Sequence, residues 1–85
     1  TNKGKFNTAL RLLELETINV TKTDINATID MYEGYTKNIL IKDLADTLDK
    51  TLSTSVLKIV EKLTKTEILV LITKALASWD VMYGS

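Results

Sequence analysis

The sequence contains no cysteine, no histidine and no proline among its 85 residues, and it has three glycines. The absence of cysteine and histidine excludes disulfides, thiol nucleophiles, imidazole bases and the usual zinc sites. The absence of cysteine also favours a reducing compartment. Because proline and glycine are so scarce, the chain has few strong helix breakers, and helix boundaries must be inferred from capping residues and periodicity.

The charge is balanced and the hydrophobic runs are short. Eleven basic and eleven acidic residues give a formal net charge of zero, so nucleic-acid binding would need a local basic patch. The longest apolar run, Ile68 to Ile72, is far too short to span a bilayer, and no signal peptide is visible, so we expect no membrane partner. At this length we expect a single domain over residues 1–85, with an ordered core at about 6–82.

Apolar residues at helical spacing predict an all-α fold, a compact bundle of about five helices. The first helix is expected to end near Glu16, and the stretch 17–23, rich in β-branched residues, reads as a connection. Thr23 is the expected N-terminal cap of the second helix. The third helix covers about 40–50, and Ser53 begins the fourth.

The last helix is predicted from a capping box and a broad apolar surface. Thr64 and Glu67 have the spacing at which each side chain accepts a hydrogen bond from the backbone amide of the other. The apolar residues that follow cover more than one helix face, which predicts burial by several neighbours and places Trp79 in the core. A buried strand over 68–72 is the competing interpretation, but the helical spacing continues beyond it.

The stretch 41–63 has the outline of a helix-turn-helix, which makes DNA binding an alternative function. A recognition helix presents arginine, lysine, asparagine or glutamine to base edges, whereas the outward positions here offer Lys58 and Lys62 among threonine, serine and glutamate. The preceding helix presents three carboxylates, those of Asp43, Asp46 and Asp49. Carboxylates repel phosphates, so a helix-turn-helix or winged-helix DNA-binding regulator remains the alternative and nucleic acid is not the favoured partner.

Catalytic and metal sites are not indicated by the sequence. The three aspartates occupy one helix face without further ligands or a calcium-loop pattern, so we interpret them as surface residues. The sequence contains no acid and base pair, nucleophile elbow or glycine-rich phosphate loop. We therefore expect no enzyme activity and no cofactor.

The pattern of the second half of the chain resembles the N-terminal domain of transcription elongation factor TFIIS, a helical module shared with Elongin A and a Mediator subunit. The positions that match are Ile39, Leu44, Thr51, Val56, Val60 and Trp79. Upstream, TDINATIDMYEGY (residues 23–35) is similar in register to the second helix of another member, the integrase-binding domain of lens epithelium-derived growth factor. The likeness covers roughly residues 6–82.

This resemblance implies a non-catalytic module that docks short disordered motifs, acidic and with an aromatic or apolar anchor, in a transcription-elongation or chromatin-associated scaffold. It implies a nuclear location, and without it we expect an intracellular one. In the integrase-binding member, the docking loops join helices one to two and four to five. The matching positions here are Val20 and Thr21 in the first loop, and Leu63, Thr64, Lys65 and Thr66 in the second. That member has an aspartate where this chain has Thr21, so its own partners are not implied.

A strip of lysines gives independent support to this interpretation. Lys58, Lys62 and Lys65 lie along one side of the fourth predicted helix and into the loop that follows it. Such a strip would steer an acidic peptide towards the domain, although an ordinary solvated face would have the same composition. The anchor of the peptide would pack against Leu63 or Val20. We expect a monomeric domain, and a structural oligomerisation bundle is a third possible class.

Overall fold

Five helices make up the part of the chain that the structure describes. The structure is a computed structural model that describes residues 2–49 and 51–83, and within these ranges it describes the side chains from residue 3 to residue 79. The helices are α1 (Asn2–Leu12), α2 (Lys22–Met31), α3 (Lys37–Leu48), α4 (Thr54–Val60) and α5 (Lys65–Tyr83). The described residues contain no strand, so the predicted all-α class is confirmed and the alternative strand at 68–72 is wrong.

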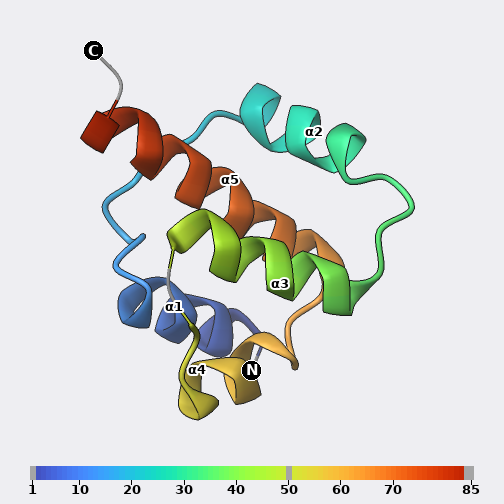
Figure 1. The fold of residues 1–85 in the computed structure, drawn as a ribbon, viewed down its shortest axis with the longest axis vertical. Coiled ribbons are helices and arrows are strands. Elements are labelled where there is room, and N and C mark those ends of the chain that lie inside the picture. Colours follow the sequence, from blue (N-terminus) through green and yellow to red (C-terminus); the bar gives the residue numbers. More distant parts are fainter. Residues whose placement is uncertain (1, 50, 84–85) are drawn as a thin grey trace.

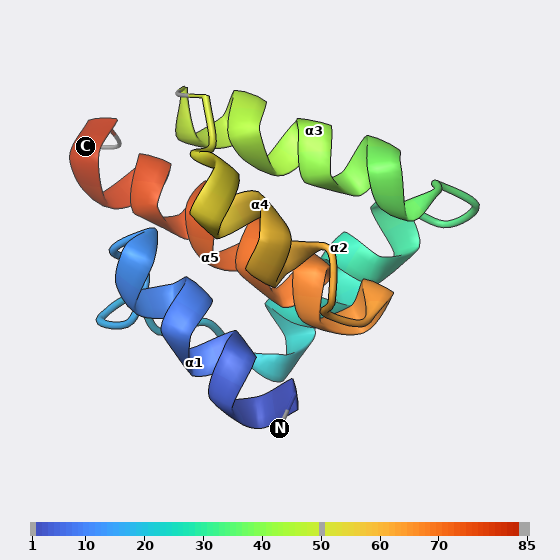
Figure 2. The same cartoon turned by 90° about the horizontal axis from the view of Figure 1, so that it is seen from below.

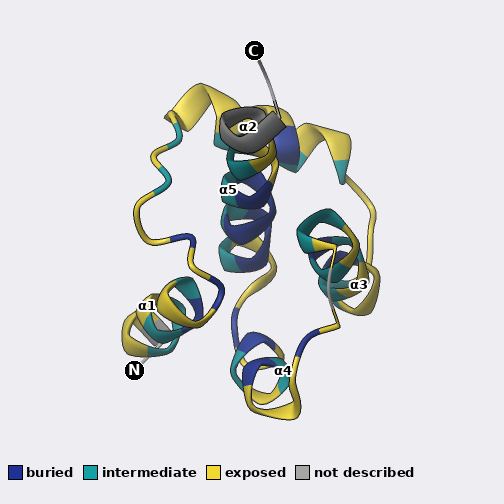
Figure 3. Ribbon diagram, turned by 60° about the vertical axis from the view of Figure 1, so that its left-hand side comes forward, coloured by how far each residue is buried: buried dark blue, intermediate teal, exposed yellow. Residues whose placement is uncertain are grey.

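Helix α5 lies at the centre of the bundle. In Figure 1, α3 runs alongside it, α2 lies above, and α1 and α4 lie below. The buried residues of α5 are Ile68, Leu69, Leu71, Ile72, Thr73 and Ala75. They span well over one helix face, as Figure 3 shows by their colour, and this confirms the prediction that several neighbours bury the helix.

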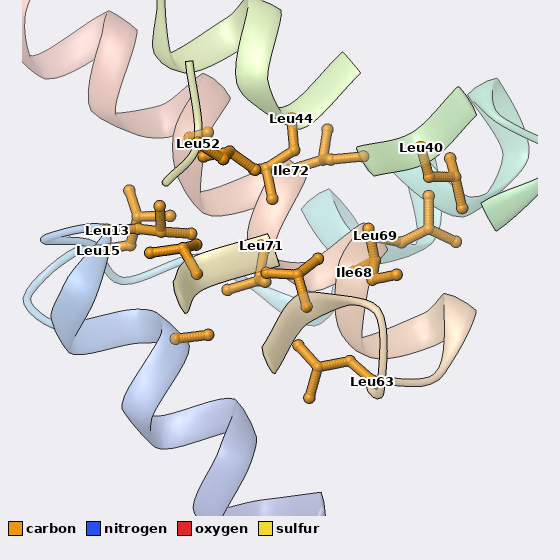
Figure 4. Packing of buried hydrophobic residues seen from close by; sticks show 14 residues of the cluster. Leu13, Leu15, Leu40, Leu44, Leu52, Leu63, Ile68, Leu69, Leu71 and Ile72 are labelled. Atoms are coloured by element: carbon orange, nitrogen blue, oxygen red, sulfur yellow. The ribbon is translucent and has the colours of Figure 1, made fainter. Parts of the chain in front are cut away.

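The core is built from aliphatic side chains of four helices and their connections (Figure 4). Leu40 and Leu44 come from α3, and Val56 and Val60 come from α4. Each fully buried side chain of this size contributes about 1.5 to 3 kcal/mol to folding. Helix α2 differs from the others, because its one buried residue is Thr28. It therefore contributes no buried apolar side chain to the core.

Helix α1 ends before the predicted end near Glu16, because the backbone turns left-handed at Glu14, with φ of 60°. The amide of Leu15 donates to the carbonyl of Leu10 at 2.9 Å, and that of Glu14 donates to the carbonyl of Arg11 at 3.2 Å. These are the two bonds of a Schellman motif. The turn buries Leu15 in the core.

The N-terminal cap of α2 is Thr21, so the prediction of Thr23 is wrong. Thr21 Oγ1 accepts a hydrogen bond from the amide of Asp24 at 3.1 Å, and Asp24 Oδ2 accepts one from the amide of Thr21 at 3.2 Å. This capping box needs an acid three residues after the cap, a spacing that Thr23 lacks. The predicted caps Ser53 and Thr64 are confirmed.

Helix α3 is shifted towards the N-terminus of the chain from its predicted range, 40–50. It begins after Thr36, whose hydroxyl accepts a hydrogen bond from the amide of Ile39 at 3.3 Å. It ends where Asp49 adopts a left-handed conformation with φ of 54°. The predicted last residue, Lys50, lies outside the described residues.

Trp79 does not lie in the core, contrary to the prediction, because its side chain is 47% exposed. The fully buried face of α5 extends no further than Ala75 in the described residues. Beyond that point the indole lies over the end of α3, where its Nε1 donates a hydrogen bond to the carbonyl oxygen of Thr47. Met82, which follows Trp79 at helical spacing in the sequence, lies outside the residues whose side chains are described.

Candidate functional site

The predicted second-loop residues form the corner between α4 and α5. The predicted site residues whose side chains are exposed at this corner are Lys58, Lys62, Thr64, Lys65 and Thr66. Leu63 points the other way and is only 1% exposed. Its side chain packs in the core, so it offers no surface on which the anchor of a partner could pack.

Hydrogen bonds hold the backbone of this corner. The amide of Lys62 donates to the carbonyl of Ile59 at 3.1 Å, and the amide of Leu63 donates to the carbonyl of Val60 at 3.0 Å. From α3, Lys37 Nζ donates to the carbonyl oxygen of Glu61. Carbonyl oxygens at a helix end have no partner within the helix, and here side-chain and turn bonds supply partners. The lysines thus project from a fixed framework.

The first turn of α1 carries two further lysines, Lys3 and Lys5. Helices α1 and α4 pack against each other and run antiparallel, so that the first turn of α1 lies beside the last turn of α4 (Figures 1 and 2). Lys3 in that first turn is exposed and Lys5 is half-buried. We call the combined set the basic surface; it consists of Lys3, Lys5, Lys58, Lys62 and Lys65. Sequence reasoning missed Lys3 and Lys5, because only the packing of α1 on α4 places them here.

The charges of this neutral chain are unevenly distributed among its elements. The basic surface carries five lysines, and the acidic residues of the same corner are Glu61 and Glu67. The carboxylate of Glu67 already accepts the amide of Thr64 at 2.9 Å in the capping box. Across the range 22–49, which holds α2 and α3, six acidic residues stand against three lysines. Helices α2 and α3 therefore carry an excess of acidic residues, although the net charge of the chain is zero.

The first-loop residues occupy a different part of the molecule. Thr21 is exposed and caps α2. Val20 is half-buried and lines a small pocket of about 200 Å³ together with Leu76 and Ala77 of α5. The pocket lies between α5 and α2, with Val20 at its edge from the first loop.

The two predicted loops are separated along α5. The first loop meets the middle of that helix, where Lys74 Nζ donates to the carbonyl oxygen of Ile18 at 2.5 Å. The second loop meets its start, at Lys65. Nine residues of α helix correspond to about 14 Å. The structure thus gathers Lys58, Lys62 and Lys65 at one site and leaves Val20 and Thr21 outside it.

The aspartates of α3 do not act as one group. Asp43 is half-buried and accepts a hydrogen bond from the phenol of Tyr32. Burial, and then the charge of Asp43, raise the pKa of Tyr32 above its usual value. Asp46 and Asp49 are exposed instead, at the edge of a groove beside α4. In residues 2–49 and 51–83, no three acidic, cysteine or histidine residues are grouped so that they could hold a metal ion.

None of the helices in the described residues combines the length and the apolar character that crossing a bilayer requires. No protein-family model, curated protein or solved structure matches this chain. The resemblance to the N-terminal domain of TFIIS therefore stays a prediction.

Proposed function

We propose that this domain is a non-catalytic protein interaction module whose basic surface docks short, disordered, acidic motifs. The observation that carries the proposal is the packing of α1 on α4, which adds Lys3 and Lys5 to the lysines of the α4–α5 corner. The lysines of the basic surface attract a flexible acidic segment and steer it to this part of the domain. The setting in a nuclear transcription-elongation or chromatin-associated scaffold rests on the sequence resemblance alone.

Charge by itself does not supply a useful affinity. An exposed ion pair contributes about 0.2 to 1 kcal/mol, so five pairs give about 1 to 5 kcal/mol, whereas micromolar binding requires about 8 kcal/mol. Burial of one leucine or phenylalanine of the motif adds about 1.5 to 3 kcal/mol. The motif therefore needs an apolar anchor beside its acidic residues.

The apolar surface beside the lysines comes from Phe6 of α1 and Ile59 of α4. Both are half-buried and pack against the core, so part of each side chain remains accessible. They take the place of Leu63 as the docking surface for the anchor. A motif that also reached Val20 would have to bridge about 14 Å along α5, which takes about four extended residues. Val20 and Thr21 are thus a secondary contact of a longer motif.

The test is an NMR titration of the isotope-labelled domain with acidic peptides that contain one phenylalanine. We expect amide shifts to concentrate at residues 3–6 and 58–66. The double variant Lys58→Glu with Lys62→Glu should bind at least tenfold more weakly, because two attractive pairs become repulsive. Lys22→Glu is the matched control, since Lys22 is an exposed lysine of α2. Shifts that cluster elsewhere, or an equal loss in the control, would contradict the proposal.

Duplex DNA is the alternative partner, and the same variants test it. The described residues contain no strand and hence no wing. Asp46 and Asp49 line the groove between α3 and α4, where a duplex that approached this helix pair would meet carboxylates. DNA would be favoured if the domain bound a duplex more tightly than the peptides, in a salt-sensitive way, and if the double variant Lys58→Glu with Lys62→Glu lost this binding. A light-scattering mass that rises with concentration would favour an oligomerisation role.

A further inference from the structure

An open groove of about 600 Å³ lies between α3 and the segment that leads into α4. Its apolar surface comes from Ile41 and Ala45 on α3 and from Leu52 and Leu57 on the other side. None of the lysines of the basic surface lines it. In Figure 2, α4 lies beneath α3 on this side of the bundle.

The groove is elongated and follows α3. Asn38, Lys42, Asp46 and Asp49 line it at successive turns of the helix. Eleven residues of α helix, from Asn38 to Asp49, correspond to about 16 Å. An extended peptide covers that distance with about five residues. The dimensions therefore match a short linear segment of a partner.

The two ends of the groove differ in charge. Asp46 and Asp49 are both exposed at one end. The same end is the C-terminus of α3, because Asp49 is its C-cap, and a helix C-terminus carries partial negative charge that favours a cation. Lys42, one turn before Asp46, is the one basic residue that lines the groove, and Asn38 at the other end is neutral. A peptide is thus held in one direction, with its cationic residue beside the two aspartates.

We propose that this groove binds a short peptide in which an aliphatic side chain packs on the half-buried Ile41 and Leu57 and an adjacent arginine or lysine pairs with Asp46 and Asp49. The required charge is opposite to that of the acidic motif on the basic surface. The domain then has two docking sites with different partners, and the second site stands whether or not the first is correct. Nucleic acid does not fit this groove, because the two aspartates repel phosphates.

The test begins with a selection of short random peptides on the wild-type domain and, in parallel, on Ala45→Met. The methionine extends from α3 into the groove and keeps a good helix former at a half-buried position. Circular dichroism and thermal unfolding establish that the variant folds. We expect the peptides that bind the wild type and not Ala45→Met to combine leucine or isoleucine with a neighbouring arginine or lysine.

The contribution of charge is measured on the best of these peptides. Asp46→Asn with Asp49→Asn should weaken its binding about fivefold, the effect of two exposed ion pairs. Asparagine tolerates the left-handed conformation at position 49, so the backbone is preserved. Asp30→Asn, an exposed aspartate of α2, is the matched control and should leave the affinity unchanged. The proposal is overturned if the selected peptides are acidic or if none of them loses binding to Ala45→Met. It is also overturned if the Asp46→Asn, Asp49→Asn variant binds the best peptide as tightly as the wild type does.

Discussion

The indole nitrogen of Trp79 donates a hydrogen bond to the carbonyl oxygen of Thr47 and so joins α5 to the last turn of α3. The last four carbonyl oxygens of an α-helix have no partner within the helix. In α3, the amide of Asp49 serves the carbonyls of Ala45 and Asp46, and the indole serves that of Thr47. Trp79 thus ties two helices together at the surface.

Trp79→Phe removes this donor and keeps an aromatic ring. We expect a loss of about 1 kcal/mol in the free energy of unfolding, the net value of one hydrogen bond. Trp79→Ala should cost less than the ~3 to 5 kcal/mol of a buried aromatic residue, since the side chain is 47% exposed. Urea unfolding followed by circular dichroism measures both. In the wild type, acrylamide should readily quench the fluorescence of this single tryptophan; a quench-resistant indole would contradict the partly exposed position.

The other long-range bonds of side chains to the backbone have a similar role. Lys37 Nζ serves the carbonyl of Glu61 at the end of α4, and Lys74 Nζ serves that of Ile18 between α1 and α2. Lysines at these positions look like members of a solvated face in the sequence. Their acceptors lie 24 and 56 residues away in the chain. Such bonds follow from packing, and helical periodicity alone does not indicate them.

Glu14 offers a test of the turn that ends α1. Its φ of 60° is left-handed, a conformation that costs a residue with a side chain roughly 1 kcal/mol relative to glycine. Glu14→Gly should therefore raise the free energy of unfolding by about 0.5 to 1 kcal/mol. Glu16→Gly, at the neighbouring exposed glutamate, whose φ is not positive, should be neutral or destabilising. Chemical unfolding of both variants gives the comparison, and a gain in the second variant alone would contradict the turn.

Glu14 also shows why some helix boundaries could not be predicted. The start of α5 was predictable, because Thr64 and Glu67 combine a cap with its reciprocal partner just before an apolar run. The end of α1 was not, because a glutamate occupies the position where glycine usually marks a Schellman motif. Apolar residues continue through Leu15, so periodicity extended the predicted helix too far. The buried side chain there belongs to the turn and not to the helix.

The residues of the candidate site likewise fall into those that the sequence indicates and those that only the packing of helices brings together. Lys58, Lys62 and Lys65 were identifiable because they lie within one local stretch. Lys3 and Lys5 were not, since they reach the site only through the contact of α1 with α4. Asp46 and Asp49 were visible as carboxylates on α3, but the apolar wall opposite them comes from another segment of the chain. A groove between two elements depends on their packing, which periodicity does not specify.

Thr21 and Thr23 provide a matched pair for the cap of α2. Thr21→Ala removes the oxygen that accepts the amide of Asp24 and should cost about 1 kcal/mol. Thr23→Ala changes an exposed residue inside the helix and should be neutral or slightly stabilising, because alanine is the better helix former. Thermal unfolding followed by circular dichroism distinguishes them. A larger loss of stability in Thr23→Ala than in Thr21→Ala would show that Thr23 is the cap.

The ionisation of Tyr32 makes the free energy of unfolding of the domain depend on pH in the alkaline range. Burial and the Asp43 carboxylate raise the pKa of its phenol in the folded state, whereas the unfolded chain titrates near a pKa of about 10. Below that value the phenol is protonated in both states, and its hydrogen bond to Asp43 contributes fully. As the pH rises above about 10, the unfolded chain loses the proton first, so the free energy of unfolding falls. The Tyr32→Phe variant has no phenol proton to lose. At neutral pH its free energy of unfolding should be about 1 to 2 kcal/mol below that of the wild type. This difference in the free energy of unfolding should become smaller as the pH rises above about 10. Denaturant unfolding of both proteins across this range measures the gap, and a constant gap would show that the phenol is not held neutral by Asp43.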